Sequence, residues 1–212
     1  MSEIFILSQY INMINNEKFV NMNRNKIVAI IPARGDSKRL GRKNIYKIWG
    51  KPMLYWAIKA CKDSKHNIEP WVSTEDPEIK KIALKLGAKI HDRDPKLSED
   101  HIYKQVVIRS AAKHIKKSIK PDIWISLQAN SPQIKAEHLD SAIDSFIEHN
   151  RQRPLDELFS VDKNLMQNAA FRIFKGDYVF QEDLSTNCGV YICELNDVHT
   201  IEDVEIIEDS KK

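Results

Sequence analysis

Seven basic side chains and only one acidic one gather in a short stretch directly after a strongly apolar run. The basic residues are Arg34, Lys38, Arg39, Arg42, Lys43, Lys47 and Lys51. Asp36 is the acidic residue, and Gly35, Gly41 and Gly50 give the backbone freedom to bend. Guanidinium and ammonium groups on a flexible loop suit the oxygens of a phosphate chain. This stretch is therefore predicted to bind a triphosphate.

Charge alone leaves two interpretations of this basic loop. A run of Lys and Arg is commonly a solvated surface, which is the role we expect for Lys47 and Lys51. The position of the loop after a predicted strand favours phosphate binding, because open α/β sheets bind ligands at the carboxyl ends of their strands. Neither a GxxxxGK[ST] loop nor a GxGxxG fingerprint is present, so the two common nucleotide-binding motifs do not apply.

Strands alternate with amphipathic helices along the chain. The run 27–31 is apolar without alternation, which is typical of a strand buried on both faces of a parallel sheet. Further strands are predicted at 71–72, 88–91 and 122–127, and helices at 53–60, 79–86, 103–114 and 136–149. This order predicts an α/β fold, a three-layer, doubly wound and mostly parallel sheet.

Four segments of the chain carry a resemblance to a known family. The first is PARGDSKRLGRKNI followed by GKPMLYWAIKA, and after it come WVSTEDPEIKKIALKLGAKI, DIWISLQANSPQI, and NCGVYI with VHTIEDVEIIE. In this order they resemble the sugar-acid cytidylyltransferases, the family that includes acylneuraminate and 3-deoxy-manno-octulosonate cytidylyltransferases. The first segment is the most specific, and it is similar to the family's nucleotide-binding signature. The match covers roughly residues 26–209 and implies the Rossmann-like fold of the nucleotide-diphospho-sugar transferases.

The resemblance implies a nucleotide site built mainly from the basic loop. Arg34 and Lys43 would be catalytic, because fixed cations stabilise the charge that develops on a pyrophosphate leaving group. The other residues implied to bind nucleotide are Ala33, Gly35, Ser37, Lys38, Arg39, Asn44, Ser73 and Gln128. Capping of the next helix is the main role that we expect for Ser73, Thr74 and Asp76. Asp36 replaces a common family glycine, and we expect its carboxylate to point away from the phosphates or to contact a metal.

The side of the site that receives the sugar acid is implied to include Arg93, Asp100, Gln128 and Ser131. An arginine at position 93 can bind the substrate carboxylate through two hydrogen bonds, or it can form a surface ion pair. The amide of Gln128 can hydrogen-bond a substrate without disturbing the charge of the triphosphate, or it can bond the local turn. Both alternatives stay open for each residue.

A metal site is implied just before the last helix, where the family has Asp residues. This chain has Asp197 and His199 there, with Asp203 as a helix cap or indirect partner. Nucleotidyl transfer normally uses Mg²⁺ held by one or two carboxylates and phosphate oxygens. Because histidine is a poor ligand for Mg²⁺, Mn²⁺ is the alternative cofactor.

Composition limits the remaining possibilities. The net charge of +3 is small and concentrated in one loop, which argues against a nucleic-acid partner. The three cysteines lack CxxC spacing and are expected to be reduced thiols in the cytoplasm. No apolar run approaches the roughly 18 residues that span a bilayer, and the start of the chain does not have the pattern of a signal peptide. We expect a loosely ordered extension at 1–25 and a single nucleotidyltransferase domain at 26–212.

The function that the resemblance implies is activation of a 3-deoxy-2-ulosonic acid, such as a nonulosonic or octulosonic acid, with CTP. The products are a CMP-sugar for surface-glycan synthesis and pyrophosphate. Two alternatives stay open. The enzyme could transfer another nucleotide or use another sugar as the acceptor, or the chain could be a nucleotide-binding homologue that has lost turnover. A homodimer is compatible with the family, but the short segment between Ser160 and Gly189 leaves little room for its extended dimerisation arm.

Overall fold

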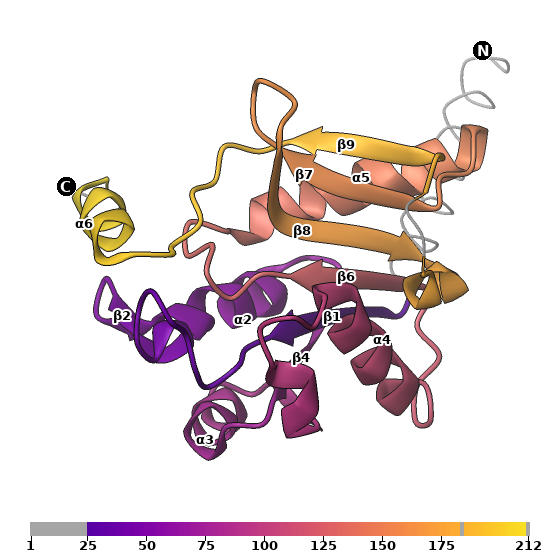
Figure 1. Ribbon diagram of the computed structural model, residues 1–212. Helices are drawn as coiled ribbons and strands as arrows, with labels where there is room; N and C mark the ends of the chain where they lie inside the picture. The colour runs from indigo at the N-terminus through magenta and orange to yellow at the C-terminus, as the bar shows by residue number, and fades with distance from the viewer. Residues whose placement is uncertain (1–24, 183–184, 211–212) are drawn as a thin grey trace, which may run out of the picture.

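Seven strands form one mixed sheet in the order β5-β4-β1-β6-β8-β7-β9 in the computed structural model, which describes residues 25–182 and 185–210 (Figure 1). The strands are β1 Ile27–Pro32, β4 Glu69–Thr74, β5 Lys89–Asp92, β6 Ile123–Leu127, β7 Glu157–Val161, β8 Gln167–Lys175 and β9 Cys188–Ile192. Parallel pairs join β1 to β4 and β6, β4 to β5, and β7 to β9. Only β8 runs antiparallel to its neighbours β6 and β7. The predicted α/β fold is confirmed, and the extension expected at 1–25 lies outside the described residues except for Asn25.

Helices cover both faces of the sheet, as the three-layer prediction requires. They are α2 Met53–Asp63, α3 Pro77–Lys85, α4 Lys104–Ile115, α5 Ala136–Gln152 and α6 Ile201–Asp209, with short 3-10 turns η1 Lys43–Ile45, η2 Pro95–Ser98 and η3 Gly176–Phe180. One core contains apolar side chains of α2 and α5, and a second core contains those of α4 and η3. Figure 1 shows α4 and α5 on opposite faces of the sheet.

The central strand β1 explains the unbroken apolar run in the sequence. Ile27, Ala29 and Ile31 pack into the core of α2 and α5, whereas Val28 and Ile30 pack into the core of α4. Because successive side chains of a strand point to opposite faces, a strand covered on both faces needs apolar residues at every position. The same burial fixes the end of β1, and with it the start of the basic loop, at the carboxyl edge of the sheet.

The last helix closes against a small hairpin next to the basic loop. β2 (Lys47–Ile48) and β3 (Lys51–Pro52) form the hairpin, and Ile48 packs with Val204 and Ile207 of α6 in a third core. The backbone N–H of Trp49 donates to the Glu208 carboxylate at 3.2 Å. The C-terminal helix α6 therefore lies beside a hairpin from the first quarter of the chain (Figure 1).

A buried histidine at the edge of the sheet predicts a loss of stability in acid. His91 is 5% exposed, and its Nδ1 lies 2.9 Å from Ser73 Oγ. Burial, together with the neighbouring His114 and Arg93, lowers the pKa of His91 from 6.5 to about 4. Above pH 6.5 the imidazole is neutral in the folded and in the unfolded chain. Below pH 6.5 the imidazole of the unfolded chain binds a proton, whereas that of the folded chain stays neutral down to about pH 4. This residue should therefore lower the free energy of unfolding by about 2 kcal/mol between pH 7 and pH 5.

Urea unfolding of wild type and His91→Gln at pH 7, 6 and 5 tests this expectation. The variant should lose less stability than wild type over this range, even if it is less stable at pH 7. His149→Gln, which removes an exposed imidazole from α5, is the control and should keep the wild-type slope. An identical pH dependence in wild type and His91→Gln would contradict the assignment.

Candidate active site

A cavity of about 280 Å³ opens at the carboxyl ends of β1 and β6. Arg34, Lys43 and Asn44 of the basic loop line it, as does Gln128, which follows β6. The rest of the wall comes mainly from the segment between β5 and α4, including Arg93 and Asp100. The structure thus brings residues predicted for the nucleotide and residues predicted for the sugar acid to one cavity.

Hydrogen bonds to its own backbone and to the end of β4 hold the first part of the basic loop. Asn44 is buried, and its side-chain amide donates to the carbonyl oxygen of Arg34 at 2.8 Å. The backbone N–H of Ala33 donates to the Ser73 carbonyl oxygen at 3.0 Å. These contacts fix the direction in which Arg34 leaves β1. Asn44 and Ala33 therefore have structural partners, and their contact with a nucleotide stays a prediction.

The turn after β4 supports the basic loop through Asp76. Its carboxylate accepts from the backbone N–H groups of Glu78 and Ile79, both at 2.9 Å, so the predicted cap of α3 is present. The same carboxylate accepts from the Arg42 guanidinium at 2.5 and 3.1 Å, and this guanidinium holds the pKa of Asp76 below its usual range. Ser73 is buried against His91 rather than lining the cavity.

Glu75 is a residue of this site that the sequence patterns did not indicate. Its carboxylate accepts from the backbone N–H of Gly35 at 2.7 Å, from Ser98 Oγ at 2.6 Å and from the Arg93 guanidinium at 2.6 and 3.1 Å. Arg93 is only 5% exposed, so its ion pair with Glu75 is buried and not on the surface, and its contact with a substrate stays a prediction. The sequence signal that could have indicated Glu75 is the position of an acidic residue directly after a buried strand.

Asp100 pairs with the cations of the basic loop. Arg34 Nη1 donates to the Asp100 carboxylate at 2.7 Å and to the Ser98 carbonyl oxygen at 3.3 Å, and Lys38 forms an ion pair with the same carboxylate. These hydrogen bonds from Lys38 and Arg34 lower the pKa of Asp100. The predicted sugar-acid residue thus holds Arg34 in position at the mouth of the cavity.

Lys43 is a desolvated cation of the cavity. Burial lowers the pKa of its ammonium, as do the positive charges of Arg39 and Arg34, whereas Asp197 and Asp203 act in the opposite direction. Across 25–182 and 185–210 no ion pair or hydrogen bond of the Lys43 ammonium is found. A group in this state gains from an incoming anion, since Asp197 and Asp203 offset only part of the cost of its burial.

Asp197 and His199, the predicted metal residues, lie near each other beside Lys43. Burial raises the pKa of Asp197, whose carboxylate accepts from the hydroxyl of the buried Ser131. His199 Nδ1 lies 3.1 Å from Arg39 Nη2, and Asp203 accepts from the backbone N–H groups of His199 and Thr200 at the start of α6. The part of the chain that the structure describes contains no group of three His, Cys, Asp or Glu residues that could hold a metal by themselves.

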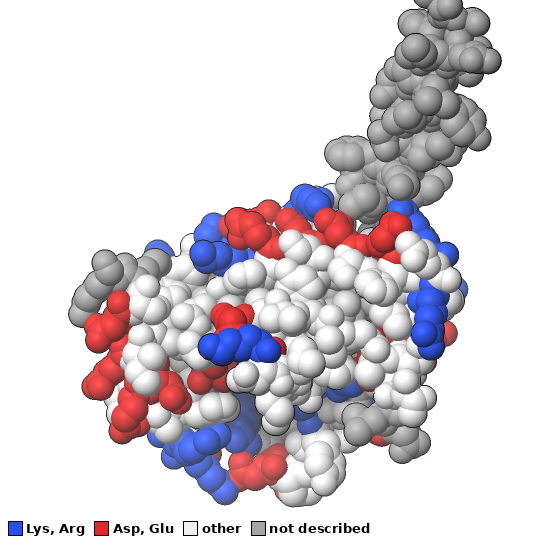
Figure 2. All heavy atoms as spheres, turned by 90° about the horizontal axis from the view of Figure 1, so that it is seen from above, with Lys and Arg blue, Asp and Glu red and all other residues white. Residues whose placement is uncertain are grey.

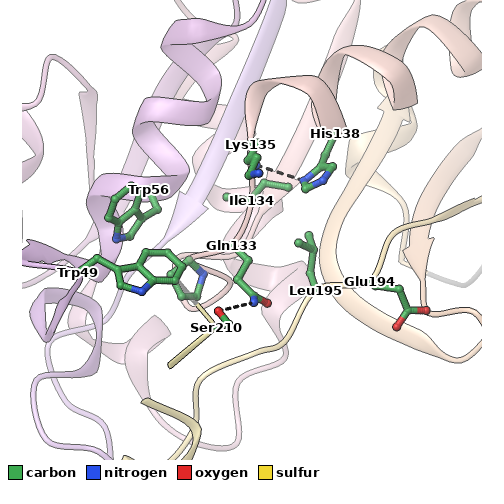
Figure 3. A pocket seen from close by; sticks show the side chains of 10 residues that line it. Trp49, Trp56, Gln133, Ile134, Lys135, His138, Glu194, Leu195 and Ser210 are labelled. Atoms are coloured by element: carbon green, nitrogen blue, oxygen red, sulfur yellow. Dashed lines mark hydrogen bonds between the residues drawn. The ribbon is translucent and has the colours of Figure 1, made fainter. Parts of the chain in front are cut away.

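A second cavity, of about 400 Å³, lies between the hairpin, α2 and the segment 132–138 (Figure 3). The rings of Trp49 and Trp56 meet edge to face there, with centroids 5.1 Å apart. Gln133 donates to Ser210 Oγ at 3.5 Å and accepts from the backbone N–H of Asn196 at 3.0 Å. None of the residues predicted for a site lines this cavity.

Positive charge is not spread over the whole surface. Basic and acidic side chains occur in small separate groups on the face shown in Figure 2. No helix within the described residues is long and apolar enough to cross a membrane.

A family model described as Cytidylyltransferase matches residues 28–191. The chain belongs to this family. Residues 28–191 contain the basic loop, the turn after β4 and the segment after β6, so the family match and the cavity rest on the same part of the chain.

Two curated relatives and one solved structure indicate the family's range. The chain is 36% identical over 135 residues to N-acylneuraminate cytidylyltransferase A of Danio rerio, which is 64% of this chain and 30% of that protein. It is 36% identical over 126 residues to pseudaminic acid cytidylyltransferase of Campylobacter jejuni, 58% of this chain and 54% of that protein. The chain thus spans about half or less of the length of these relatives.

The fold is also that of a solved structure, CMP:2-keto-3-deoxy-manno-octonic acid synthetase complexed with CTP. The TM-score is 0.70 at 17% sequence identity, and the match covers 88% of this chain and 98% of that one. This likeness shows the fold.

Proposed function

We propose that this chain is a cytidylyltransferase that joins CTP to a 3-deoxy-2-ulosonic acid and so supplies a CMP-sugar for surface-glycan synthesis. The observation that carries the proposal is the cavity at the carboxyl edge of the sheet, where Arg34 and Lys43 lie with the uncharged amide of Gln128. Family membership and the relatives that act on acylneuraminate and pseudaminic acid support the same proposal.

In the proposed reaction, the anomeric hydroxyl of the sugar acid attacks the α-phosphorus of CTP in line. The new oxygen–phosphorus bond forms as the bond between the α-phosphorus and the bridging oxygen breaks, the hydroxyl proton passes to solvent, and pyrophosphate leaves. Arg34 and Lys43 stabilise the negative charge that spreads over the phosphates. Asp100 and Glu75 position the loop, so that catalysis depends on orientation and electrostatics.

We propose Mg²⁺ as the cofactor, with Mn²⁺ as the alternative. Asp197 is the one carboxylate among the predicted metal residues that lies in this region without capping a helix, and Mg²⁺ sites commonly combine one or two carboxylates with substrate phosphates. When bound, the ion supplies charge neutralisation at the phosphates. His199 does not add a hard oxygen ligand, and its ring nitrogen lies within hydrogen-bonding distance of Arg39.

The histidine at position 199 predicts an unusual metal dependence. Because imidazole suits Mn²⁺ better than Mg²⁺, Mn²⁺ should support activity at a lower concentration than Mg²⁺ does. His199→Asp adds one negative charge and one hard ligand, and should lower the Mg²⁺ concentration for half-maximal activity by about tenfold. Titrations of activity with both metals, and Mn²⁺ binding followed by electron paramagnetic resonance with CTP present, measure this. Unchanged metal titrations in His199→Asp would place His199 outside the metal site.

A pyrophosphate-release assay tests the proposed function. Each of the four nucleoside triphosphates is combined with a panel of nonulosonic and octulosonic acids, and release is expected with CTP and at least one acid. Release with another nucleotide, or only with a neutral sugar, would support the alternative that the enzyme transfers a different nucleotide or acts on a different sugar. Binding of CTP without release would support loss of turnover, which the replacement of a family Asp by His199 favours.

A further inference from the structure

Lys104, the first residue of α4, is a cation of the cavity that lies outside the basic loop. The positive charges that act on Lys43 come from Arg39 and Arg34, whereas the one that acts on Lys104 comes from Arg172 of β8. Asp197 attracts both lysines. The cavity therefore has a cation at the start of α4 in addition to those of the basic loop.

The ammonium of Lys104 is poorly compensated by the protein. Burial lowers its pKa to about 8, because the attraction of Asp197 does not offset the loss of water. Within 25–182 and 185–210 no ion pair or hydrogen bond of this ammonium is found. By contrast, Arg93 is paired with Glu75 and Arg172 with Glu157. A half-buried cation without a bonded partner is stabilised by an anion from outside.

Two features point to a singly charged anion instead of a second phosphate chain. The basic loop already holds Arg34, Lys38, Arg39 and Lys43, which together suit a triphosphate. The cavity wall after β6 presents amides, Gln128 and Asn130, and the amide of Asn130 donates to the Val198 carbonyl oxygen at 3.2 Å. One lysine at the start of a helix, on an element other than the basic loop, matches a ligand that carries one carboxylate.

We infer that Lys104 binds the carboxylate of the sugar-acid substrate and so selects acids over neutral sugars. The inference rests on the proposed function, and it assigns to Lys104 the role that Arg93 cannot fill while it is paired with Glu75. Because α4 packs into the core through Ile108 and Ala111, the position of Lys104 is set by the fold before the substrate binds.

The test is Lys104→Met, which removes the charge and keeps much of the length of the side chain. The KM for the acid that wild type uses should rise about 10- to 100-fold, with the dissociation constant for CTP changed less than about twofold. Lys104→Arg should recover most of the affinity. Lys113→Met removes an exposed charge from the same helix and should behave as wild type.

Substrate selectivity gives a second readout. Wild type should discriminate strongly against the amide of the same sugar acid, and Lys104→Met should lose most of that discrimination. Weaker CTP binding with an unchanged KM for the acid would make Lys104 a phosphate ligand and overturn the inference. A fall in kcat with both affinities unchanged would overturn it as well.

The inference and the proposed function fail in different ways. If wild type releases no pyrophosphate with any acid, calorimetry with CTP present measures binding of 3-deoxy-manno-octulosonate and N-acetylneuraminate directly. Binding to wild type that Lys104→Met loses would support the inference even though turnover is absent. Absence of binding to wild type, or equal binding to the variant, would overturn it. CTP binding by each variant confirms that the domain is folded.

Discussion

Replacing Lys43 or Arg34 by Ala should lower kcat by about 10²–10³, because each change removes a fixed charge from the phosphates in the transition state. Lys43→Ala deletes an ammonium with no partner among the described residues, so its effect should fall on turnover more than on stability. Arg34→Ala also leaves Asp100 beside the phosphates with Lys38 as its remaining partner, so it should weaken CTP binding more than Lys43→Ala.

Steady-state kinetics and equilibrium binding of CTP separate these effects. Lys47→Ala is the matched control, since Lys47 belongs to the same basic stretch but is exposed on β2. Adding Asp100→Asn to Arg34→Ala should recover part of the lost affinity, because it removes the carboxylate that Arg34 no longer neutralises. Near-normal turnover in both single variants would refute the assignment of the basic loop to the phosphates.

Gly35→Ala should lower activity by about 10², although it adds only one methyl group. A Cβ at position 35 would lie 2.5 Å from Asp76 Oδ2, so the loop or the capped turn must move. A displacement of about 1 Å of the phosphate ligands is enough for a loss of this size. The displacement would also disturb the hydrogen bond from the Gly35 N–H to Glu75.

Gly41→Ala is the control for this variant. Gly41 lies in the same loop and is exposed, and an added Cβ would meet no other group within 4 Å, so wild-type kinetics are expected. Turnover and thermal unfolding of both variants are the measurements. Equal activity of Gly35→Ala and Gly41→Ala would show that the contact between the loop and Asp76 is not needed for catalysis.

The main elements of the fold could be predicted from the chain because their signals are local. The apolar run of β1, the helical spacing after Pro52 and the cap formed by Asp76 each involve residues that are close in sequence. The strands β7 and β8 were not predicted. The antiparallel direction of β8 is not a local signal, because side-chain periodicity is the same in parallel and antiparallel strands.

The sequence by itself determined the family, the α/β fold class and the basic loop that faces the cavity, since each depends on residue types within short segments and on the order of those segments along the chain. Tertiary structure alone decided what each charge in the site contacts. Glu75 accepts from the N–H of Gly35, 40 positions away, and Arg34 meets Asp100, 66 positions away. Arg93 is paired with Glu75 while Lys104 has no such partner among the described residues. The physical reason is that the state of a charged side chain depends on burial and on partners that only folding brings within hydrogen-bond distance.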